Sequence, residues 1–362
     1  MGLFKKDGID QTTVLDALKS VKDPDLQRDV VTLGFVKELQ IEGSRVSFNL
    51  ELTTPACPVK DQLKAEAERV VSTIPGVESV AVQMTFKVTS KLTPQARTLI
   101  PEVRNTIAVA SGKGGVGKST VAANLAVALM QCGAKVGLMD ADVYGPSIPI
   151  LMGASEAPQV TQDRILPPLA QGVKMISMGY FLPKNEAVIW RGPMLHKMIQ
   201  QFLGEVEWGE LDYLIIDLPP GTGDIQLSLC QTIPLTGAVI VSTPQDLALE
   251  VASKAIAMFR KLQTPILGIV ENMSYYLCPH CGERDEIFGH GGARAASQRL
   301  GYPFLGEIPL NPGIRRNSDS GRPAVLEVET PYSQAFVEVA SATAAQVSIA
   351  NFTAPQAPVI EG

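Results

Sequence analysis

The sequence predicts an α/β protein whose main domain is a doubly wound, mainly parallel sheet, preceded by a small α+β domain. Two observations carry this prediction. Short apolar runs lack polar alternation, as strands buried on both faces require, and helical stretches such as residues 247–262 separate the later runs. The runs are residues 134–139, 213–216, 238–241 and 266–270. In such a sheet we expect ligands to bind at the carboxyl ends of the strands.

The small domain is expected over residues 8–90. Its apolar residues recur at helical spacing in residues 14–21 and 63–74, which predicts two amphipathic helices. They alternate with polar residues in 46–52 and 80–88, which predicts two strands with one buried face each. Helices and strands are therefore mixed without the βαβ repetition of the main domain.

Three segments follow. Residues 91–104 contain Pro94 and Pro101 and are interpreted as a linker. Residues 105–345 hold the predicted parallel sheet, and residues 346–362 are expected to be a flexible tail because the end of the chain is rich in Ala, Thr and Pro.

Composition excludes several classes of function. The net charge of −6 argues against a nucleic-acid partner, because affinity for phosphates comes from clustered Lys and Arg. No apolar run reaches the roughly 18 residues of a membrane-spanning helix, and the first residues lack an apolar core of signal-peptide length. We therefore expect a cytoplasmic protein with no membrane partner. The odd number of cysteines, five in a long chain, does not indicate a disulfide framework.

A glycine-rich stretch at residues 112–120 fits the P-loop template G-x-x-x-x-G-K-[ST] at every fixed position, between an apolar run and a helical pattern. Its residues are Gly112, Lys113, Gly114, Gly115, Val116, Gly117, Lys118, Ser119 and Thr120. Glycines let the backbone turn tightly and point N–H groups at phosphate oxygens. Lys118 is expected to neutralise phosphate charge and Ser119 to bind Mg²⁺, while the following helix adds its positive dipole end. The stretch predicts an ATP and Mg²⁺ site.

Two strands end in aspartates that could serve this site. Asp217 closes the run 213–216, as in the Walker B pattern, where a carboxylate at a strand tip organises Mg²⁺, usually through water. Asp140 and Asp142 follow the run 134–139. An aspartate at a strand end is also a common helix cap or turn former.

Cys278 and Cys281 form the pattern C-x-x-C. Two thiolates at this spacing can bind one metal or one cluster, but they fill only half of a four-ligand site. Four interpretations compete: a homodimer that bridges a [4Fe-4S] cluster between two pairs, zinc held within one chain with His280 or His290, a thioredoxin-like redox pair, and an incidental pair in a loop. Spacing alone favours zinc and cluster equally.

Cys57 lies between a predicted strand and a predicted helix, with Pro58 suited to the first helical position. Its sulfur is expected at a helix N-terminus, where the dipole favours the thiolate. The alternative is a buried structural cysteine.

The loop with its additional Lys113 resembles the deviant Walker A group, which contains MinD, ParA, the nitrogenase iron protein and the Mrp/ApbC family. The first lysine of that group reaches the nucleotide of a facing subunit, which implies a homodimer. Several segments are similar to the Mrp/ApbC family of P-loop ATPases that carry iron–sulfur clusters. They are residues 140–147, 188–194, 217–224, 271–274 and 304–309, together with the cysteine pair.

This resemblance implies a homodimer with a labile [4Fe-4S] cluster bridged by Cys278 and Cys281, and ATP-dependent delivery of that cluster to apo iron–sulfur proteins, with cluster scaffold proteins as further partners. It implies that Lys113, Lys118 and Asp142 act in hydrolysis, Asp142 by positioning or deprotonating the attacking water. It implies that Asn272 reads the adenine edge. The segment around Cys57 resembles a small iron–sulfur-assembly domain, which favours a role for Cys57 in cluster or metal handling.

Two rival functions share the loop. A MinD- or ParA-like positioning or regulatory ATPase with a structural zinc site is the main alternative. MinD-like proteins end in a basic amphipathic membrane helix, whereas residues 341–358 contain no Lys or Arg. An electron donor like the nitrogenase iron protein is the other, although its cysteines do not form a C-x-x-C pair.

Overall fold

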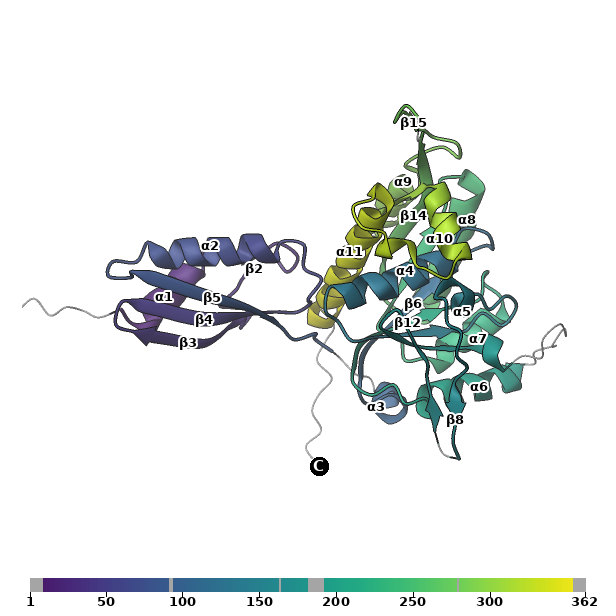
Figure 1. The fold of residues 1–362 in the computed structure, drawn as a ribbon, viewed down its shortest axis with the longest axis horizontal. Coiled ribbons are helices and arrows are strands. Elements are labelled where there is room, and N and C mark those ends of the chain that lie inside the picture. Colours follow the sequence, from purple (N-terminus) through teal and green to yellow (C-terminus); the bar gives the residue numbers. More distant parts are fainter. Residues whose placement is uncertain (1–8, 91–93, 163, 182–191, 279, 354–362) are drawn as a thin grey trace, which may run out of the picture. The chain divides into compact units, whose positions relative to one another are not determined.

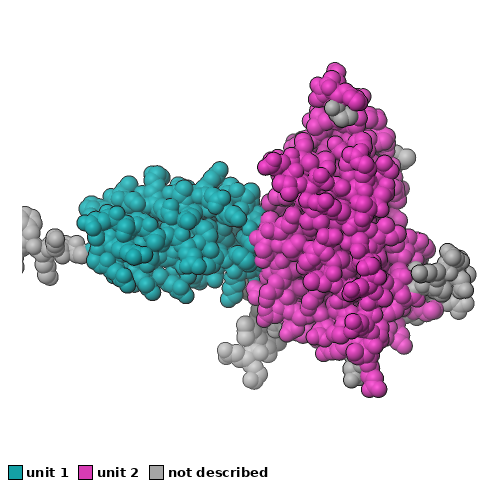
Figure 2. Space-filling view, in the orientation of Figure 1, with its two compact units in different colours: residues 1–89 teal, residues 90–362 magenta. Residues whose placement is uncertain are grey.

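The structure is a computed structural model. It describes residues 9–90, 94–162, 164–181, 192–278 and 280–353. The chain forms two compact units, Met1–Thr89 and Ser90–Gly362, which carry different colours in Figure 2.

The first unit packs two helices with a three-stranded sheet of order β3-β4-β5 (Figure 1). β3 and β4 are antiparallel, whereas β4 and β5 are parallel. The helix α1 begins after Asp10, whose carboxylate accepts a hydrogen bond from the Thr13 N–H at 2.7 Å. The elements are α1 (Gln11–Leu18), β1 (Lys22–Asp23), β2 (Arg28–Asp29), β3 (Val36–Glu42), β4 (Arg45–Leu52), α2 (Lys60–Ser72) and β5 (Ser79–Phe86).

The strand pattern of this unit agrees with the sequence in β4 and departs from it at the end of β5. Every second residue of β4 is buried, which confirms the predicted alternation. In β5, Val82 is buried and Val80 and Met84 are half-buried against the core, which confirms the alternation as far as Met84. Phe86 is 47% exposed, so the expectation is wrong at this position. The physical reason is position: β5 is an edge strand, and Phe86 is its last residue.

The second unit is built on a nine-stranded, mainly parallel sheet, as the sequence predicts. Its order is β10-β11-β7-β12-β6-β13-β14-β15, and β16 also pairs with β14. Within this sheet, the two antiparallel pairings among the described strands are those of the short strands β10 and β15. The strands are β6 (Val103–Ala110), β7 (Val136–Asp140), β10 (Leu169–Ala170), β11 (Val173–Ser177), β12 (Leu211–Asp217), β13 (Gly237–Ser242), β14 (Ile266–Leu277), β15 (Arg284–Asp285) and β16 (Phe304–Leu310).

Helices cover both faces of this sheet, which is why its central strands are apolar without alternation. α6, α7, α8 and α9 share one core with the sheet, while α4 and α11 pack together on the other side. The remaining elements are α3 (Pro94–Leu99), α4 (Lys118–Gln131), α5 (Ile148–Leu151), the hairpin β8 (Gln159–Val160) and β9 (Ile165–Leu166), the turn η1 (Met178–Tyr180), α6 (Gly192–Gly204), α7 (Asp224–Thr232), α8 (Asp246–Lys261), α9 (Gly292–Leu300), α10 (Pro312–Asp319), η2 (Ala324–Leu326) and α11 (Pro331–Thr353). None of the helices in the described part of the chain is both long and apolar enough to cross a bilayer.

Two expected boundaries are wrong. The segment 91–104 is not a linker throughout, because α3 occupies Pro94–Leu99 and β6 begins at Val103. The flexible tail does not begin at residue 346, because α11 continues to Thr353. Residues 346–353 contain a single alanine, and tertiary packing orders them, because Val347, Ser348 and Asn351 are buried. Residues 354–362 lie outside the described residues.

The last turns of α11 give a test of this boundary. The Asn351 side chain is 5% exposed and donates a hydrogen bond to the Asn105 side chain in β6 at 2.9 Å. We expect Asn351→Ala to lower the free energy of unfolding of the second unit by about 1–2 kcal/mol. Both tryptophans, Trp190 and Trp208, belong to this unit, so tryptophan fluorescence during urea unfolding reports on it.

The matched control is Thr353→Ala, an exposed residue in the same turn, which should change stability by less than about 0.5 kcal/mol. Equal and negligible effects of both substitutions would contradict the assignment of these residues to a packed helix.

Candidate functional site

The glycine-rich loop connects β6 to α4, the first strand and the first long helix of the parallel sheet. Gly115 and Gly117 have φ values of +80° and +81°, a conformation that favours glycine. A Cβ at Gly114 or Gly115 would meet no atom within 4 Å, so the loop presents open space at these positions. A Cβ at Gly117 would overlap the side-chain amide of Asn272. The loop is therefore open on the side where a phosphate would approach and tightly packed against β14.

A buried cluster of charges lies at the start of α4. The Lys118 ammonium is 2.5 Å from the Asp217 carboxylate and 3.7 Å from that of Asp142. The Ser119 hydroxyl donates to the other oxygen of Asp217 at 2.6 Å. Asp217 ends β12, which lies beside β6 in the sheet, so the two strands bring the loop and the carboxylate together. The lysine thus neutralises carboxylate charge within this cluster.

Burial raises the pKa of the Asp217 carboxyl, and the neighbouring charge of Lys118 and the hydrogen bonds from Lys118 and Ser119 only partly oppose the rise. A carboxylate and a hydroxyl side by side are hard oxygen donors of the kind Mg²⁺ prefers. The donor set and the open loop at Gly114 and Gly115 therefore fit a magnesium–nucleotide ligand.

Asp140 organises the loop that follows β7, a role that sequence reasoning did not assign. Its carboxylate is fully buried and accepts hydrogen bonds from the Ser177 hydroxyl at 2.9 Å and from the Ile148 and Asp142 N–H groups at 3.1 Å each. Burial raises the pKa of the Asp140 carboxyl to about 7, and the charge of Asp217 adds to the rise. The pair of aspartates two residues apart is the sequence signal that could have indicated this role.

Lys113 and Asn272 make contacts within the chain. The Lys113 ammonium donates to the Gln245 side-chain oxygen at 3.2 Å. The Asn272 amide donates to the Val116 carbonyl of the loop at 2.8 Å, and the residue is 6% exposed. Asn272 therefore ties β14 to the loop, a contact that the sequence did not indicate.

The cysteine pair lies on a hairpin at the far end of β14, which stands out from the body of the second unit (Figure 1). Cys278 follows the last residue of β14, and its N–H donates to the Glu283 carbonyl at 2.9 Å. Cys278 is half-buried and Cys281 is exposed. Hydrogen bonds from the Cys281 and His280 backbone N–H groups lower the pKa of the Cys278 thiol, which favours the thiolate that binds metals.

The described residues do not assemble a zinc site from one chain. No third His, Cys, Asp or Glu among them gathers with both thiols at metal-binding distances. His290 lies instead beside Ser274 and Arg284, with contacts of 3.2 and 2.8 Å. A complete four-ligand site on this hairpin therefore needs ligands from outside the described chain.

Cys57 does not have the environment that the sequence predicts. Helix α2 begins at Lys60 with Val59 as its N-cap, so Pro58 is not in the helix. Cys57 is 6% exposed within the core of the first unit, and burial raises the pKa of its thiol to about 11. The expected thiolate is therefore wrong, because loss of solvation outweighs the nearby backbone N–H.

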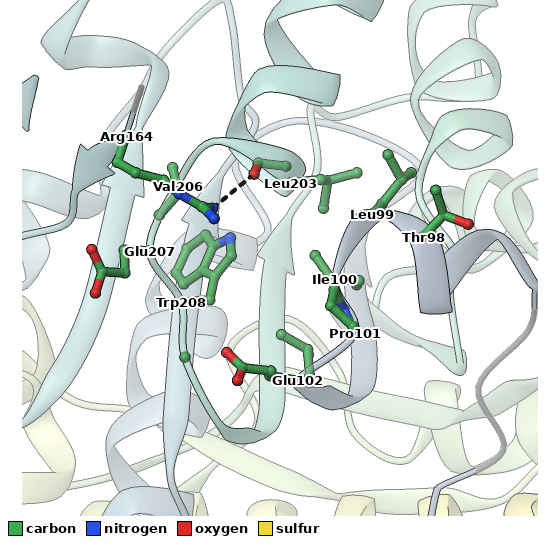
Figure 3. Close-up of a pocket in the computed structure, with 13 residues that line it drawn as sticks. Thr98, Leu99, Ile100, Pro101, Glu102, Arg164, Leu203, Val206, Glu207 and Trp208 are labelled. Carbon is green, nitrogen blue, oxygen red and sulfur yellow. Dashed lines mark hydrogen bonds between the residues drawn. The ribbon is translucent and has the colours of Figure 1, made fainter. Parts of the chain in front are cut away.

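A cavity of about 770 Å³ in the second unit lies away from these groups. Figure 3 shows Ile100, Pro101 and Glu102 on one side and Arg164 and Trp208 on another. These residues precede β6 or β12 or lie in other loops, so the cavity is at the amino ends of the strands. The P-loop lies at the opposite, carboxyl end, where ligands bind in open α/β sheets. The segment 188–194 lies mostly outside the described residues.

A glycine-rich loop after a central parallel strand, with a lysine and a strand-end aspartate beside it, defines a P-loop NTPase. Comparison with known families narrows this class. The model described as NUBPL iron-transfer P-loop NTPase matches residues 102–344, and the model described as iron-sulfur cluster assembly protein matches residues 11–84. The chain belongs to the family of NUBPL-type iron-transfer P-loop NTPases.

Individual relatives agree. The chain is 49% identical over 340 residues to an iron-sulfur cluster carrier protein of Deinococcus radiodurans, covering 93% of this chain and 95% of that one. It is similar to the structure of a nucleotide-binding protein in complex with ADP from Archaeoglobus fulgidus, with a TM-score of 0.59, 44% identity, and coverage of 68% and 98%. It is also similar to the septum site-determining protein MinD with Mg-ADP from Pyrococcus horikoshii, with a TM-score of 0.50, 27% identity, and coverage of 65% and 94%.

The raised pKa of Asp140 gives a test of the charge cluster. Because the folded-state pKa is about 7 and the ordinary value is 3.8, the unfolded chain releases this proton first as pH rises. Ionisation of Asp140 should therefore lower the free energy of unfolding of the wild type by about 2–3 kcal/mol between pH 5 and pH 8. Asp140→Asn cannot ionise, so its free energy of unfolding should rise by that amount relative to the wild type over this range.

Urea unfolding of the nucleotide-free protein at pH 5, 6.5 and 8, followed by tryptophan fluorescence, measures this difference. Asp285→Asn, at an exposed aspartate, is the control and should show no such trend. A difference between wild type and Asp140→Asn that does not change with pH would contradict the assignment.

Proposed function

We propose that the protein is an ATP-dependent iron–sulfur cluster carrier. In this proposal a homodimer bridges one [4Fe-4S] cluster, binds and hydrolyses ATP, and delivers the cluster to apo iron–sulfur proteins. The observation that carries the proposal is a shared strand. β14 bonds to the P-loop through Asn272 and ends next to Cys278, so one strand joins the proposed nucleotide site to the cysteine pair.

The nucleotide site would use the residues 112–120 of the loop to bind the phosphates. Lys118 would leave Asp217 and bind the β- and γ-phosphates. Asp217 would then bind a magnesium ion through water, so both partners of the ion pair would gain a new partner. Bound Mg²⁺, held also by Ser119, would supply charge neutralisation on the phosphates. Asp142, 3.7 Å from Lys118, would orient the attacking water or take its proton.

Lys113 would act across the dimer. Its hydrogen bond to Gln245 at 3.2 Å is a resting contact between two long, flexible side chains, and it is only partly buried. We propose that Lys113 exchanges this contact for the nucleotide of the facing subunit. Asn272 would approach the adenine edge after breaking its hydrogen bond to the Val116 carbonyl. Because Asn272 is buried beside Gly117, this rearrangement would be larger than that of Lys113.

The cluster would be held by two copies of Cys278 and Cys281. Three features support this assignment: the hairpin is exposed, the Cys278 thiol has a lowered pKa, and a third ligand within the described chain is missing. Four thiolates from two chains satisfy the ligand number of a [4Fe-4S] cluster. An exposed position allows ligand exchange with an acceptor protein. Dimer formation, cluster type and transfer are all parts of the proposal.

The first unit would select partners rather than hold the cluster. A role for Cys57 in handling metal needs a local opening that exposes its thiol, because the buried thiol is protonated at neutral pH. We place the protein in the cytoplasm, where cysteines stay reduced, with cluster scaffold proteins as donors. No membrane or nucleic-acid partner is part of the proposal.

Removal of one cysteine tests the cluster. After anaerobic reconstitution with iron and sulfide, the wild type should hold about four irons per dimer, with the absorption of an iron–sulfur cluster. Cys278→Ala should lose them, because two of the four thiolates disappear. Cys132→Ala, at a half-buried cysteine outside the hairpin, is the control and should keep the full count. Zinc in place of iron, or an unchanged Cys278→Ala, would overturn the proposal.

Removal of the loop lysine tests the coupling to ATP. Lys118→Ala should abolish hydrolysis and leave the reconstituted cluster in place, because the cysteine hairpin is a separate element. Transfer to an acceptor apoprotein in cells should fall with hydrolysis. The measurements are phosphate release, iron content and acceptor activity in cells that lack the wild-type gene. Transfer at the wild-type level by this variant would refute the coupling.

A further inference from the structure

A second set of potential metal ligands lies at the base of the cysteine hairpin. Glu271 in β14 and Glu307 in β16 face each other in the sheet, and His290 lies just before α9. One ligand atom from each of the three residues lies within 4.8 Å of the other two. The Ser274 hydroxyl contacts all three, at 2.6 Å from Glu271, 3.2 Å from His290 and 3.3 Å from Glu307.

The buried member of this cluster is already oriented. Glu271 is fully buried, and its two oxygens accept hydrogen bonds from the Gly291 N–H at 3.1 Å and the Ala293 N–H at 2.6 Å. Oε1 also accepts from the Ser274 hydroxyl at 2.6 Å, so one lone pair remains available on Oε2, and an ion at Oε1 would displace that hydroxyl. His290 lies 3.9 Å from Glu271 and 3.8 Å from Glu307. Ligands of a small divalent ion lie roughly 3.0–3.5 Å apart, so contraction by about 1 Å would close the site.

A cation already occupies the cluster. The Arg284 guanidinium lies 2.8 and 3.1 Å from the two ring nitrogens of His290 and 3.7 Å from Glu307. Arginine has only donors and a neutral imidazole has one acceptor nitrogen, so one of the two His290 nitrogens that Arg284 approaches accepts, as it would toward a metal ion. Arg284 is 39% exposed and stacks on the Tyr275 ring at 4.0 Å. It can therefore keep its contact with Tyr275 when an ion displaces it from His290 and Glu307.

We propose that Glu271, His290 and Glu307 form a binding site for a divalent transition ion of the Fe²⁺, Co²⁺ or Zn²⁺ class, with Arg284 holding the place of the ion in its absence. Two carboxylates and one imidazole suit such ions, whereas the thiol pair at the tip is a soft donor set. The two sites are therefore chemically distinct.

The link to the cysteines runs through the hairpin. Arg284 pairs with Leu277, the residue before Cys278, so displacement of its side chain by an ion occurs beside the cysteine pair. The consequence for function is that ferrous iron is held next to the hairpin that binds the cluster. This consequence rests on the proposed function, but the existence of the site does not.

The test uses the full chain with Cys278→Ser and Cys281→Ser, free of nucleotide, and Co²⁺ as the probe. Equilibrium dialysis with metal counting should find one Co²⁺ bound per chain. This binding should require the side chains of Glu307 and His290. Its visible absorption should lack the thiolate-to-metal bands of a cysteine site. Glu307→Gln and His290→Gln in this background should each weaken binding at least about tenfold, as expected for lost ligands.

Arg284→Gln separates a metal site from a structural ion network. Removal of the competing cation should tighten Co²⁺ binding about tenfold. A network that only stabilises the fold would show weaker binding or none. Glu283→Gln and Asp285→Asn, at exposed carboxylates of the same hairpin, are controls and should leave the affinity unchanged.

Binding that is unaffected by Glu307→Gln and His290→Gln, or weakened by Arg284→Gln, would overturn the proposal. Glu271 is left intact because it is buried and caps α9. The protein in this test has no cysteine pair, so its outcome is independent of cluster reconstitution and of the proposed carrier function.

Discussion

A lysine buried among aspartates is the interaction on which the second unit depends. Lys118 begins α4, its partner Asp217 ends β12, and its partner Asp142 lies two residues after the end of β7. Each charge alone would be costly to bury, and removal of one partner leaves the others unpaired. The cluster therefore holds the start of a helix and the ends of two strands in one arrangement. In the proposed function, a nucleotide phosphate would compete with Asp217 for this lysine.

The strand β14 gives the fold its second organising feature. Its residues 267–272 are buried in the sheet, where Asn272 bonds to the loop, and its last residues lead out to the cysteine hairpin. The polar cluster of Glu271, Ser274 and His290 lies between these ends. β14 therefore connects the loop and the cysteine hairpin through one backbone.

The two kinds of cysteine in the chain show how burial decides thiol chemistry. Cys57 lies in an apolar core, where loss of solvation keeps the thiol protonated. Cys278 lies on an exposed turn, where backbone N–H groups stabilise the thiolate. Both follow a strand in the sequence, so local pattern could not separate them. The separation came from what packs around each sulfur.

The sequence by itself determined the parallel sheet, the loop at residues 112–120, the strand-end aspartates and the cysteine pair, because each depends on local periodicity or on residue types at short, fixed spacing. It could not determine that burial raises the pKa of Asp140, that Asn272 bonds to the loop, or that α11 continues to Thr353. The cluster of Glu271, His290 and Glu307 joins three elements separated by as many as 36 positions in the chain. Only the tertiary structure decided these features, because burial and long-range pairing arise when distant segments pack together.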